Sequence, residues 1–386
     1  MRLAYLSDWK RWPCEEAQQE EIFAKEFAAL GHRVHFAFFV PDLPEAERRE
    51  TWHGQPVTLF RRDRGQYGRL SRWLSDLLLT GAVDAVQVRN DPGYASLAHG
   101  LARKHRVPFV FHLSILNGPV LVEEASEEPF PRSWLQRVKG LVGGRLVDRV
   151  ARSCDLLLPI SEAMAAHYAG LGRTGPSVAL PMGCRGAAAW PAPGPRDFVE
   201  ALYVGSLDRN RRLDFLLRAL ARARVAQPRL RLSFLGSARR PASLDFLRAR
   251  TKALGLEEAV RFEEPVPRAA VPGRIAAADF CVSPVPPTPY FLLSSPTKLM
   301  ESLGVGRPAV ANDIPDQAVL LADSGGGLCV SYEEAAFGDA MAALAADPAR
   351  REEMGRRGAA HMAAHRDYGL LARRALAAYA RVGVKA

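Results

Sequence analysis

The chain has 386 residues, of which 48% are hydrophobic and 24% charged, and its formal net charge is +10. This length exceeds that of one ordinary domain and fits two domains of roughly 150 to 200 residues, each able to bury a core. The longest apolar runs fall well short of the ~20 residues of a membrane span, so we expect neither a transmembrane helix nor a signal peptide.

Charge and cysteine usage narrow the classes of partner. The positive charge favours anionic partners such as nucleotides, phospholipid surfaces or nucleic acid, but a biased codon pool explains it equally well, because only seven of the 52 basic residues are lysine. No nucleic-acid-binding module is recognisable, so we expect no nucleic-acid partner. The five cysteines lack any metal-ligand spacing, which indicates reduced thiols in the cytoplasm and no metal site.

Short apolar runs alternate with helical patterns in the first half of the chain, which is typical of a parallel α/β sheet. The expected strands lie at 2–7, 33–40, 56–60, 85–88, 108–114 and 156–161. The expected helices include 15–30, closed by Gly31, and 92–105. Ser161 is expected to cap the helix that follows the last of these strands.

A second series of strands follows at 200–207, 231–237, 260–264, 279–284, 307–312 and 326–330, and a helical tail begins near Glu352. Between the two series, the sequence GAAAWPAPGPRD suits neither helix nor strand, so residues 186–197 are interpreted as an interdomain linker. We therefore predict domains at 1–185 and 198–365. Each is expected to be doubly wound, with ligands at the carboxyl ends of its strands.

The stretch SSPTKLMES, residues 294–302, reads as a helix that begins after a proline-rich loop. Ser295 is the expected N-cap and Pro296 the first helical residue. The free backbone amides near Thr297, Lys298 and Leu299 carry about half a positive charge, to which the lysine adds a full one. This helix end is therefore predicted to bind a diphosphate.

Glu301 shares a helix face with Lys298 and Thr297, because residues three and four apart are neighbours on a helix. Its carboxylate would lie roughly 6 Å along the axis from Thr297, where it can accept hydrogen bonds from the ribose of a bound nucleotide. The alternative is a capped surface helix with one charge pair.

The run 277–312, which contains this stretch, resembles the nucleotide-binding signature of family 4 of the glycosyltransferases. The resemblance implies the GT-B architecture, two Rossmann-like doubly wound domains that face a central cleft. It also implies a retaining enzyme that takes a sugar from a nucleoside diphosphate. The family pairs two glutamates as E-x7-E; Glu301 matches the second, while Leu293 stands in place of the first.

Further segments follow in the family's order. ALYVGSLDRNRRLDFLLRAL resembles the segment in which an arginine and a lysine hold the donor diphosphate; Arg211 stands for the lysine and Ser206 replaces the arginine. In this interpretation the second cation is either missing or supplied by Arg209 or Arg212, and a solvated turn is the alternative for all three arginines. VRFEEPVP resembles the segment that meets the nucleobase, which implies contacts from Pro265 and Val266.

The N-terminal half resembles the family in pattern. PFVFHLS places His112 at a strand end, where the family often has a functional histidine; a histidine satisfied within the sheet is the alternative. AVQVRNDP places Arg89 and Asn90 at another strand end, where they would face the acceptor. Residues 366–386 look like the family's closing helix, which packs back on the first domain.

Together these features predict a metal-independent hexosyltransferase with Lys298, Arg211 and His112 as catalytic residues. Its donor is a UDP- or GDP-linked sugar, which is a substrate, so no cofactor is expected. The acceptor is a saccharide or a lipid-linked molecule in polysaccharide or glycoconjugate biosynthesis in the cytoplasm. One alternative is a non-catalytic two-lobed nucleotide or sugar binder. Another, a tandem Rossmann oxidoreductase, is disfavoured because no G-x-G-x-x-G follows either first strand.

Residues 132–153 mix apolar side chains with six basic residues in the sequence RSWLQRVKGLVGGRLVDRVARS. Such a helix could rest on an anionic bilayer, which predicts a peripheral protein on the inner face of the cell membrane. The alternative is a core-packed helix with a basic outer face, and Gly143 and Gly144 weaken a single long helix.

Overall fold

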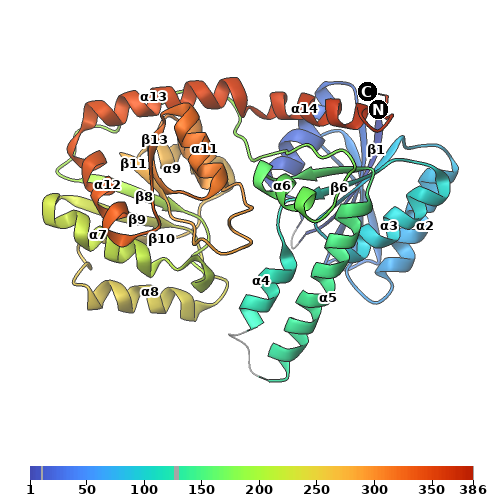
Figure 1. Ribbon diagram of the computed structural model, residues 1–386, viewed down its shortest axis with the longest axis horizontal. Coiled ribbons are helices and arrows are strands. Elements are labelled where there is room, and N and C mark those ends of the chain that lie inside the picture. Colours follow the sequence, from blue (N-terminus) through green and yellow to red (C-terminus); the bar gives the residue numbers. More distant parts are fainter. Residues whose placement is uncertain (10–11, 126–129, 386) are drawn as a thin grey trace. The chain divides into compact units, whose positions relative to one another are not determined.

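The computed structural model describes residues 1–9, 12–125 and 130–385 (Figure 1). The chain divides into two compact units, and each is described by itself. The first unit comprises Met1–Pro181 and Tyr368–Ala386, and the second comprises Met182–Asp367.

The first unit is built on a seven-stranded sheet in the order β3-β4-β2-β1-β5-β6-β7. Its strands are β1 (Arg2–Asp8), β2 (Arg33–Val40), β3 (Glu47–Trp52), β4 (Gln55–Arg61), β5 (Ala85–Arg89), β6 (Phe109–Leu113) and β7 (Leu156–Pro159). All neighbouring pairs are parallel except β3 with β4. The central strands β1, β5 and β6 are buried almost throughout, as expected for a sheet covered on both faces.

Helices of the first unit connect these strands (Figure 1). They are η1 (Gln19–Glu26), α1 (Phe27–Ala29), α2 (Gln66–Leu79), α3 (Pro92–His105), α4 (Asn117–Glu124), α5 (Arg132–Ser153), α6 (Glu162–Gly170) and α14 (Tyr368–Ala380). The helix expected at 15–30 is present, but its main part, η1, is a π-helix. The predicted cap of α6 is confirmed, because the Ser161 hydroxyl accepts a hydrogen bond of 3.0 Å from the Met164 amide.

The second unit is a six-stranded parallel sheet in the order β10-β9-β8-β11-β12-β13. Its strands are β8 (Val199–Val204), β9 (Leu230–Leu235), β10 (Val260–Glu263), β11 (Phe280–Ser283), β12 (Ala309–Asn312) and β13 (Gly327–Val330). Its helices are η3 (Arg209–Arg211), α7 (Asp214–Ala226), α8 (Pro241–Ala253), η4 (Arg268–Ala270), α9 (Val271–Ala276), α10 (Thr297–Gly304), α11 (Pro315–Ser324), α12 (Glu334–Ala346) and α13 (Pro348–His365). The predicted fold class of two doubly wound α/β domains is confirmed.

The segment 186–197, expected to be a linker, has neither helix nor strand and lies within the second unit. Its backbone is held by that unit, since the amides of Ala188 and Trp190 donate to the carbonyls of Gly304 and Val305. The guanidinium of Arg307 in turn donates to the Trp190 carbonyl at 3.0 Å. These bonds make the segment a part of the second unit's surface.

Candidate functional site

The helix α10 begins at Thr297, one residue later than expected, and Pro296 occupies the N-cap position without a side-chain cap. The prediction that Ser295 caps the helix is wrong. Its hydroxyl donates to Asp316 at 2.7 Å and accepts a bond of 3.1 Å from the Met182 amide. The Leu299 amide donates to the Pro296 carbonyl at 3.1 Å, so Thr297 and Lys298 carry the first-turn amides that suit an anion.

Lys298 extends from the first turn of α10 towards the end of β8. Its Nζ donates to the Tyr203 hydroxyl at 3.1 Å and lies 4.2 Å from the centre of the same ring. Burial, with a further contribution from the nearby Arg211, lowers the pKa of Lys298 well below its ordinary value. A desolvated ammonium without a carboxylate contact gains most from an anionic ligand.

Two glycines lie at the ends of β8 and β9, and the first of them lies beside this lysine. Gly205 has φ +141°, and a Cβ there would lie 3.6 Å from Cε of Lys298. Gly236 has φ +150°, and a Cβ there would lie only 2.0 Å from the Gly205 carbonyl oxygen. Only glycine fits at such a position, so the close approach of the two strand ends depends on it.

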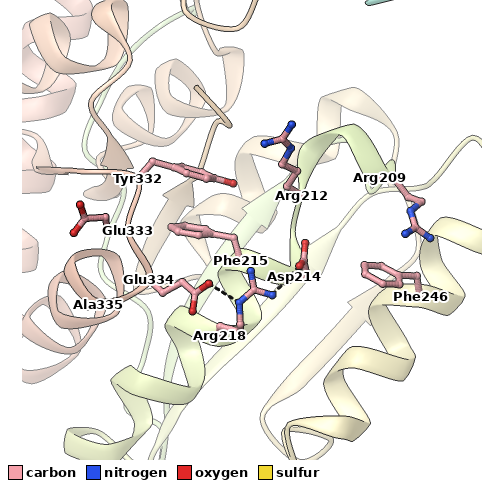
Figure 2. Close-up of a pocket in the computed structure, with 10 residues that line it drawn as sticks. All are labelled: Arg209, Arg212, Asp214, Phe215, Arg218, Phe246, Tyr332, Glu333, Glu334 and Ala335. Carbon is pink, nitrogen blue, oxygen red and sulfur yellow. Dashed lines mark hydrogen bonds and ion pairs between the residues drawn. The ribbon is translucent and has the colours of Figure 1, made fainter. Parts of the chain in front are cut away.

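The three arginines of the turn after β8 point to two different places. Arg211 stacks on Phe291 with its guanidinium 4.8 Å from the ring centre, and its charge acts on Lys298. Arg209 and Arg212 instead line a pocket of about 710 Å³ between the starts of α7 and α12 (Figure 2). The structure therefore groups only Arg211 with Lys298.

The pocket with Arg209 and Arg212 is aromatic and balanced in charge. Figure 2 shows Arg209 over Phe246, at 4.2 Å from the ring centre, and Arg218 between Asp214 and Glu334. Acidic residues pair with Arg218 at 2.7 and 2.5 Å. These contacts account for much of the local charge without a ligand.

Ser206, predicted at the place of a phosphate-binding arginine, is engaged within its own turn. Its hydroxyl donates to Asp208 at 2.5 Å, and its carbonyl accepts a bond of 3.0 Å from the Tyr203 hydroxyl. Tyr203 therefore connects this turn to Lys298. Tyr203 was not predicted as a site residue, because it is a strand residue that belongs to no sequence motif.

Glu301 is partly buried on the second turn of α10. Burial raises its pKa to about 7, against the opposing effects of Arg268 and Lys298. Arg268 belongs to η4, which follows the loop that contains Pro265 and Val266, both exposed. The predicted ribose-binding and base-binding residues therefore lie on neighbouring parts of one unit.

The first unit has a pocket of about 450 Å³ at the carboxyl ends of β1 and β5. Its lining comprises Ser7, Asp8, Trp9, Gln19, Arg62, Arg89, Asn90, Asp91, Ile115 and Asn117. The two residues predicted to face an acceptor, Arg89 and Asn90, both line it. Asn90 has φ +60°, a conformation that asparagine tolerates, and its side chain is bound to Ser114 at 2.7 and 2.8 Å.

Both arginines of this pocket pair with carboxylates within the unit. Arg89 contacts Glu16 at 2.6 Å, and Arg62 contacts Asp8 at 2.9 Å. Gln19, at the start of η1, is only 1% exposed, and neither of its side-chain amide atoms has a hydrogen-bond partner among the described residues. Gln19 was not predicted as a site residue, because in the sequence it looks like an ordinary helix residue.

His112 lies on β6 between β5 and β7 and is not exposed. Neither ring nitrogen has a hydrogen-bond partner in the described part of the chain. Burial, together with Arg89, lowers the pKa of His112 well below its ordinary value, so the imidazole is neutral. His112 does not line the pocket, and its catalytic role stays a prediction.

No group of three or more His, Cys, Asp or Glu side chains within residues 1–9, 12–125 and 130–385 could hold a metal ion. A membrane-spanning helix is likewise not found in this described part.

Two family models match the chain in succession. One is described as "Glycosyl transferase 4-like domain" and matches residues 22–183; the other is described as "Glycosyl transferases group 1" and matches residues 199–347. Among curated proteins, the D-inositol 3-phosphate glycosyltransferase of Kineococcus radiotolerans is 29% identical over 56% of this chain and 55% of that protein. The protein of the same name from Streptomyces avermitilis is 27% identical over 70% of this chain and 62% of that protein. The chain thus matches little more than half the length of these relatives.

Solved structures agree in fold. Sucrose-phosphate synthase from Thermosynechococcus elongatus has a TM-score of 0.73 at 14% identity, over 98% of this chain and 99% of that one. Anabaena HepE in complex with UDP has a TM-score of 0.72 at 16% identity, over 98% and 100%. The two halves of the chain thus each match a glycosyltransferase domain model, and its fold is that of these solved structures.

Proposed function

We propose that the protein transfers a hexosyl group from a nucleoside diphosphate sugar, with retention of configuration, to a saccharide or lipid-linked acceptor in polysaccharide or glycoconjugate biosynthesis. The observation that carries this proposal is the group of Lys298, Arg211 and Glu301 around the first turns of α10. Lys298, which no carboxylate of the described residues contacts, and Arg211 of η3 match a diphosphate. Glu301, one turn further along α10, matches the ribose.

The chemistry follows from where charge develops. As the glycosidic bond breaks, negative charge builds on the leaving diphosphate. Lys298, Arg211 and the first-turn amides of α10 stabilise that charge because they are fixed in place and partly shielded from water. In this proposal the protein's own cations take the place of a metal ion.

UDP is the proposed nucleotide. Support comes from the neighbours, since HepE was solved with UDP and with UDP-glucose, and trehalose-phosphate synthase from Burkholderia vietnamiensis is named as UDP-forming. Pro265 and Val266 would meet the base and Glu301 the ribose. GDP remains the competitor that the experiment below must separate.

The proposed acceptor is uncharged and rich in hydroxyl groups. In the first unit's pocket, Arg89 and Arg62 already pair with Glu16 and Asp8, so no cation is left in excess for an acceptor phosphate. The buried Gln19 amide offers both a donor and an acceptor to a hydroxyl group. This differs from the relatives named for inositol 3-phosphate.

A non-catalytic nucleotide or sugar binder is the second candidate. It is favoured by Leu293 in place of the family's first glutamate, and by Ser206 in place of an arginine. The transferase and a nucleotide binder both require the nucleotide site, so these two differ only in turnover, whereas a sugar binder would bind sugar without needing the nucleotide.

Calorimetric titration of UDP and GDP in the presence of EDTA tests the site. We expect UDP to bind the wild type, and Lys298→Ala to weaken binding by about 30-fold, as is usual for the loss of a charged hydrogen bond. Lys252→Ala on α8 is the matched control and should bind like the wild type. If neither nucleotide binds, the proposal is wrong.

Turnover is then measured as UDP released from UDP-glucose with and without saccharide acceptors. Release that depends on acceptor supports the transferase. Nucleotide binding without any release, across acceptors and sugar donors, supports the binder.

A further inference from the structure

Helix α5 presents a row of exposed apolar side chains that the first unit does not cover. We call it the α5 stripe; it consists of Trp134, Leu135, Val138, Leu141 and Val142, which are 58%, 47%, 37%, 57% and 50% exposed. Phe130, just before the helix, is 83% exposed. Exposed apolar residues are ordinary when single, but a contiguous row is typical of a binding surface.

The spacing places the stripe on one face of the helix. Its members lie one, four, seven and eight residues after Trp134, which is the period of a helix face. The opposite face of α5 packs closely against α4. The approach is so close that a Cβ at Gly140 would lie 2.7 Å from the Gly118 carbonyl oxygen on α4. Val147 and Val150 continue this buried face towards the sheet. The stripe is therefore held outward by the contact of α5 with α4.

The hairpin of α4 and α5 extends beyond the rest of the first unit (Figure 1). The end of α5 that carries the stripe is the end farther from the sheet, so the stripe is reachable by a broad, flat partner. Such a partner would not need to enter either pocket.

Cations border the stripe. At 100° per residue, Arg137 lies on one edge of the stripe and Lys139 on the other, and Arg145 and Arg149 continue its line along the helix. Asp148 is the single acidic residue of α5, against six basic ones, and it accepts a hydrogen bond of 3.1 Å from the Tyr168 hydroxyl. Acidic residues precede α5 in the hairpin sequence, so the attraction rests on this face and not on the hairpin's net charge.

We propose that the α5 stripe docks on an anionic lipid bilayer surface. Trp134, Leu135, Val138, Leu141 and Val142 enter the headgroup region, while Arg137 and Lys139 reach lipid phosphates with their apolar stems along the stripe. A second copy of this chain fits the face less well, because a two-fold contact sets these cations against their own copies. The proposal does not depend on the proposed function.

Vesicle co-sedimentation of the full chain tests the proposal. The vesicles are phosphatidylcholine alone, or phosphatidylcholine mixed with phosphatidylglycerol. We expect binding to the anionic vesicles only, falling with salt, because each basic residue near such a surface adds attraction that salt screens. Arg137→Gln/Lys139→Gln should weaken binding by about 30-fold. The matched control, Lys104→Gln/Lys252→Gln, removes two exposed cations elsewhere and should bind more than tenfold better than that variant.

A triple variant, Trp134→Ser/Leu141→Ser/Val142→Ser, tests the apolar part and should lose binding by more than tenfold. Its matched control is Leu79→Ser/Val225→Ser/Val319→Ser, at residues that are 72%, 86% and 57% exposed. All these side chains are at the surface, so unfolding temperatures should stay close to that of the wild type. Trp134→Phe should bind like the wild type but lose the blue shift of tryptophan emission on anionic vesicles.

Two results would overturn the proposal. The first is a failure of the vesicle test: either the wild type does not bind anionic vesicles, or a stripe variant binds them as strongly as its control. The other is a dimer, seen by sedimentation at equilibrium, that the stripe variant abolishes while vesicle binding is absent, since the occupant would then be a second copy.

Discussion

Lys298 and Glu301 lie one turn apart on α10, and burial moves both away from their charged forms. It lowers the pKa of the lysine and raises the pKa of the glutamate to about 7. Because folding has already removed water from these two groups, part of the desolvation free energy of ligand binding is incurred during folding. This pair therefore has consequences for stability that a surface charge pair of the same spacing would lack.

Glu301→Gln should change how stability depends on pH. The folded-state pKa of Glu301 is raised above the ordinary carboxyl value of 4.5, so the folded wild type binds the extra proton and loses stability as pH rises from about 4.5 to about 7. The loss is at most about 3 kcal/mol. Glutamine stays neutral and avoids it. Urea unfolding at pH 5 and pH 8 measures the difference.

The control for this prediction is Glu264→Gln, an exposed carboxylate in the loop after β10. It should follow the wild-type profile. Parallel pH profiles for Glu301→Gln and the wild type would show that the folded and unfolded states hold this proton equally.

The role of an individual residue could be predicted from the sequence where its hydrogen-bond partner is close in sequence, and could not be predicted where that partner is distant in sequence. Ser161 caps α6 through its own helix. Ser295 has the same chemistry before α10, but Asp316 and the Met182 amide, both distant in sequence, take its hydroxyl. Tyr203 and Gln19 were missed for the same reason, since their importance comes from tertiary neighbours.

At the level of elements, hydrophobic pattern predicted every parallel strand but not β3. The sequence of β3, ERRETW, has no apolar core face, so its pairing depends on the turn to β4. His53 and Gly54 both have positive φ, at 51° and 77°, which is the backbone of a tight hairpin turn. Five charged or polar residues in a row before Trp52 gave no reason to expect a strand, because β3 pairs along one side with β4 and has no apolar alternation of its own.

The cap of α6 offers a test at this scale. Ser161→Ala removes the acceptor of the Met164 amide and should lower the free energy of unfolding by about 1 kcal/mol. Ser96→Ala on α3 is the matched control, because that exposed hydroxyl only donates back to the Pro92 carbonyl. Thermal unfolding of the two variants compares them. Equal transitions would mean that solvent replaces the cap without cost.

At the scale of the whole molecule, the first unit is discontinuous in sequence. Its last helix, α14, buries Leu371, Ala372, Ala375, Ala378 and Tyr379, and the Tyr379 hydroxyl donates to Gln87 on β5. Tyr379 also makes an edge contact with Phe27, at 6.2 Å between ring centres. The family resemblance predicted a closing helix at 366–386 that packs back on the first domain, whereas its individual partners, such as Gln87 at 292 residues away in the chain, follow only from the folded structure.

Because α14 belongs to the first unit, a destabilising substitution in α14 is expected to affect the strands of that unit. Leu371 is 2% exposed, so Leu371→Ala leaves a cavity and should destabilise the first unit by about 2 to 4 kcal/mol. Hydrogen exchange should then quicken in β1 and β5, because those strands share a unit with α14, while β8 and β9 keep their wild-type rates. Leu370→Ala, at a residue 39% exposed, should change neither set. If instead β8 and β9 quicken together with β1 and β5, the two units unfold as one cooperative body, and the division seen in contacts does not extend to stability.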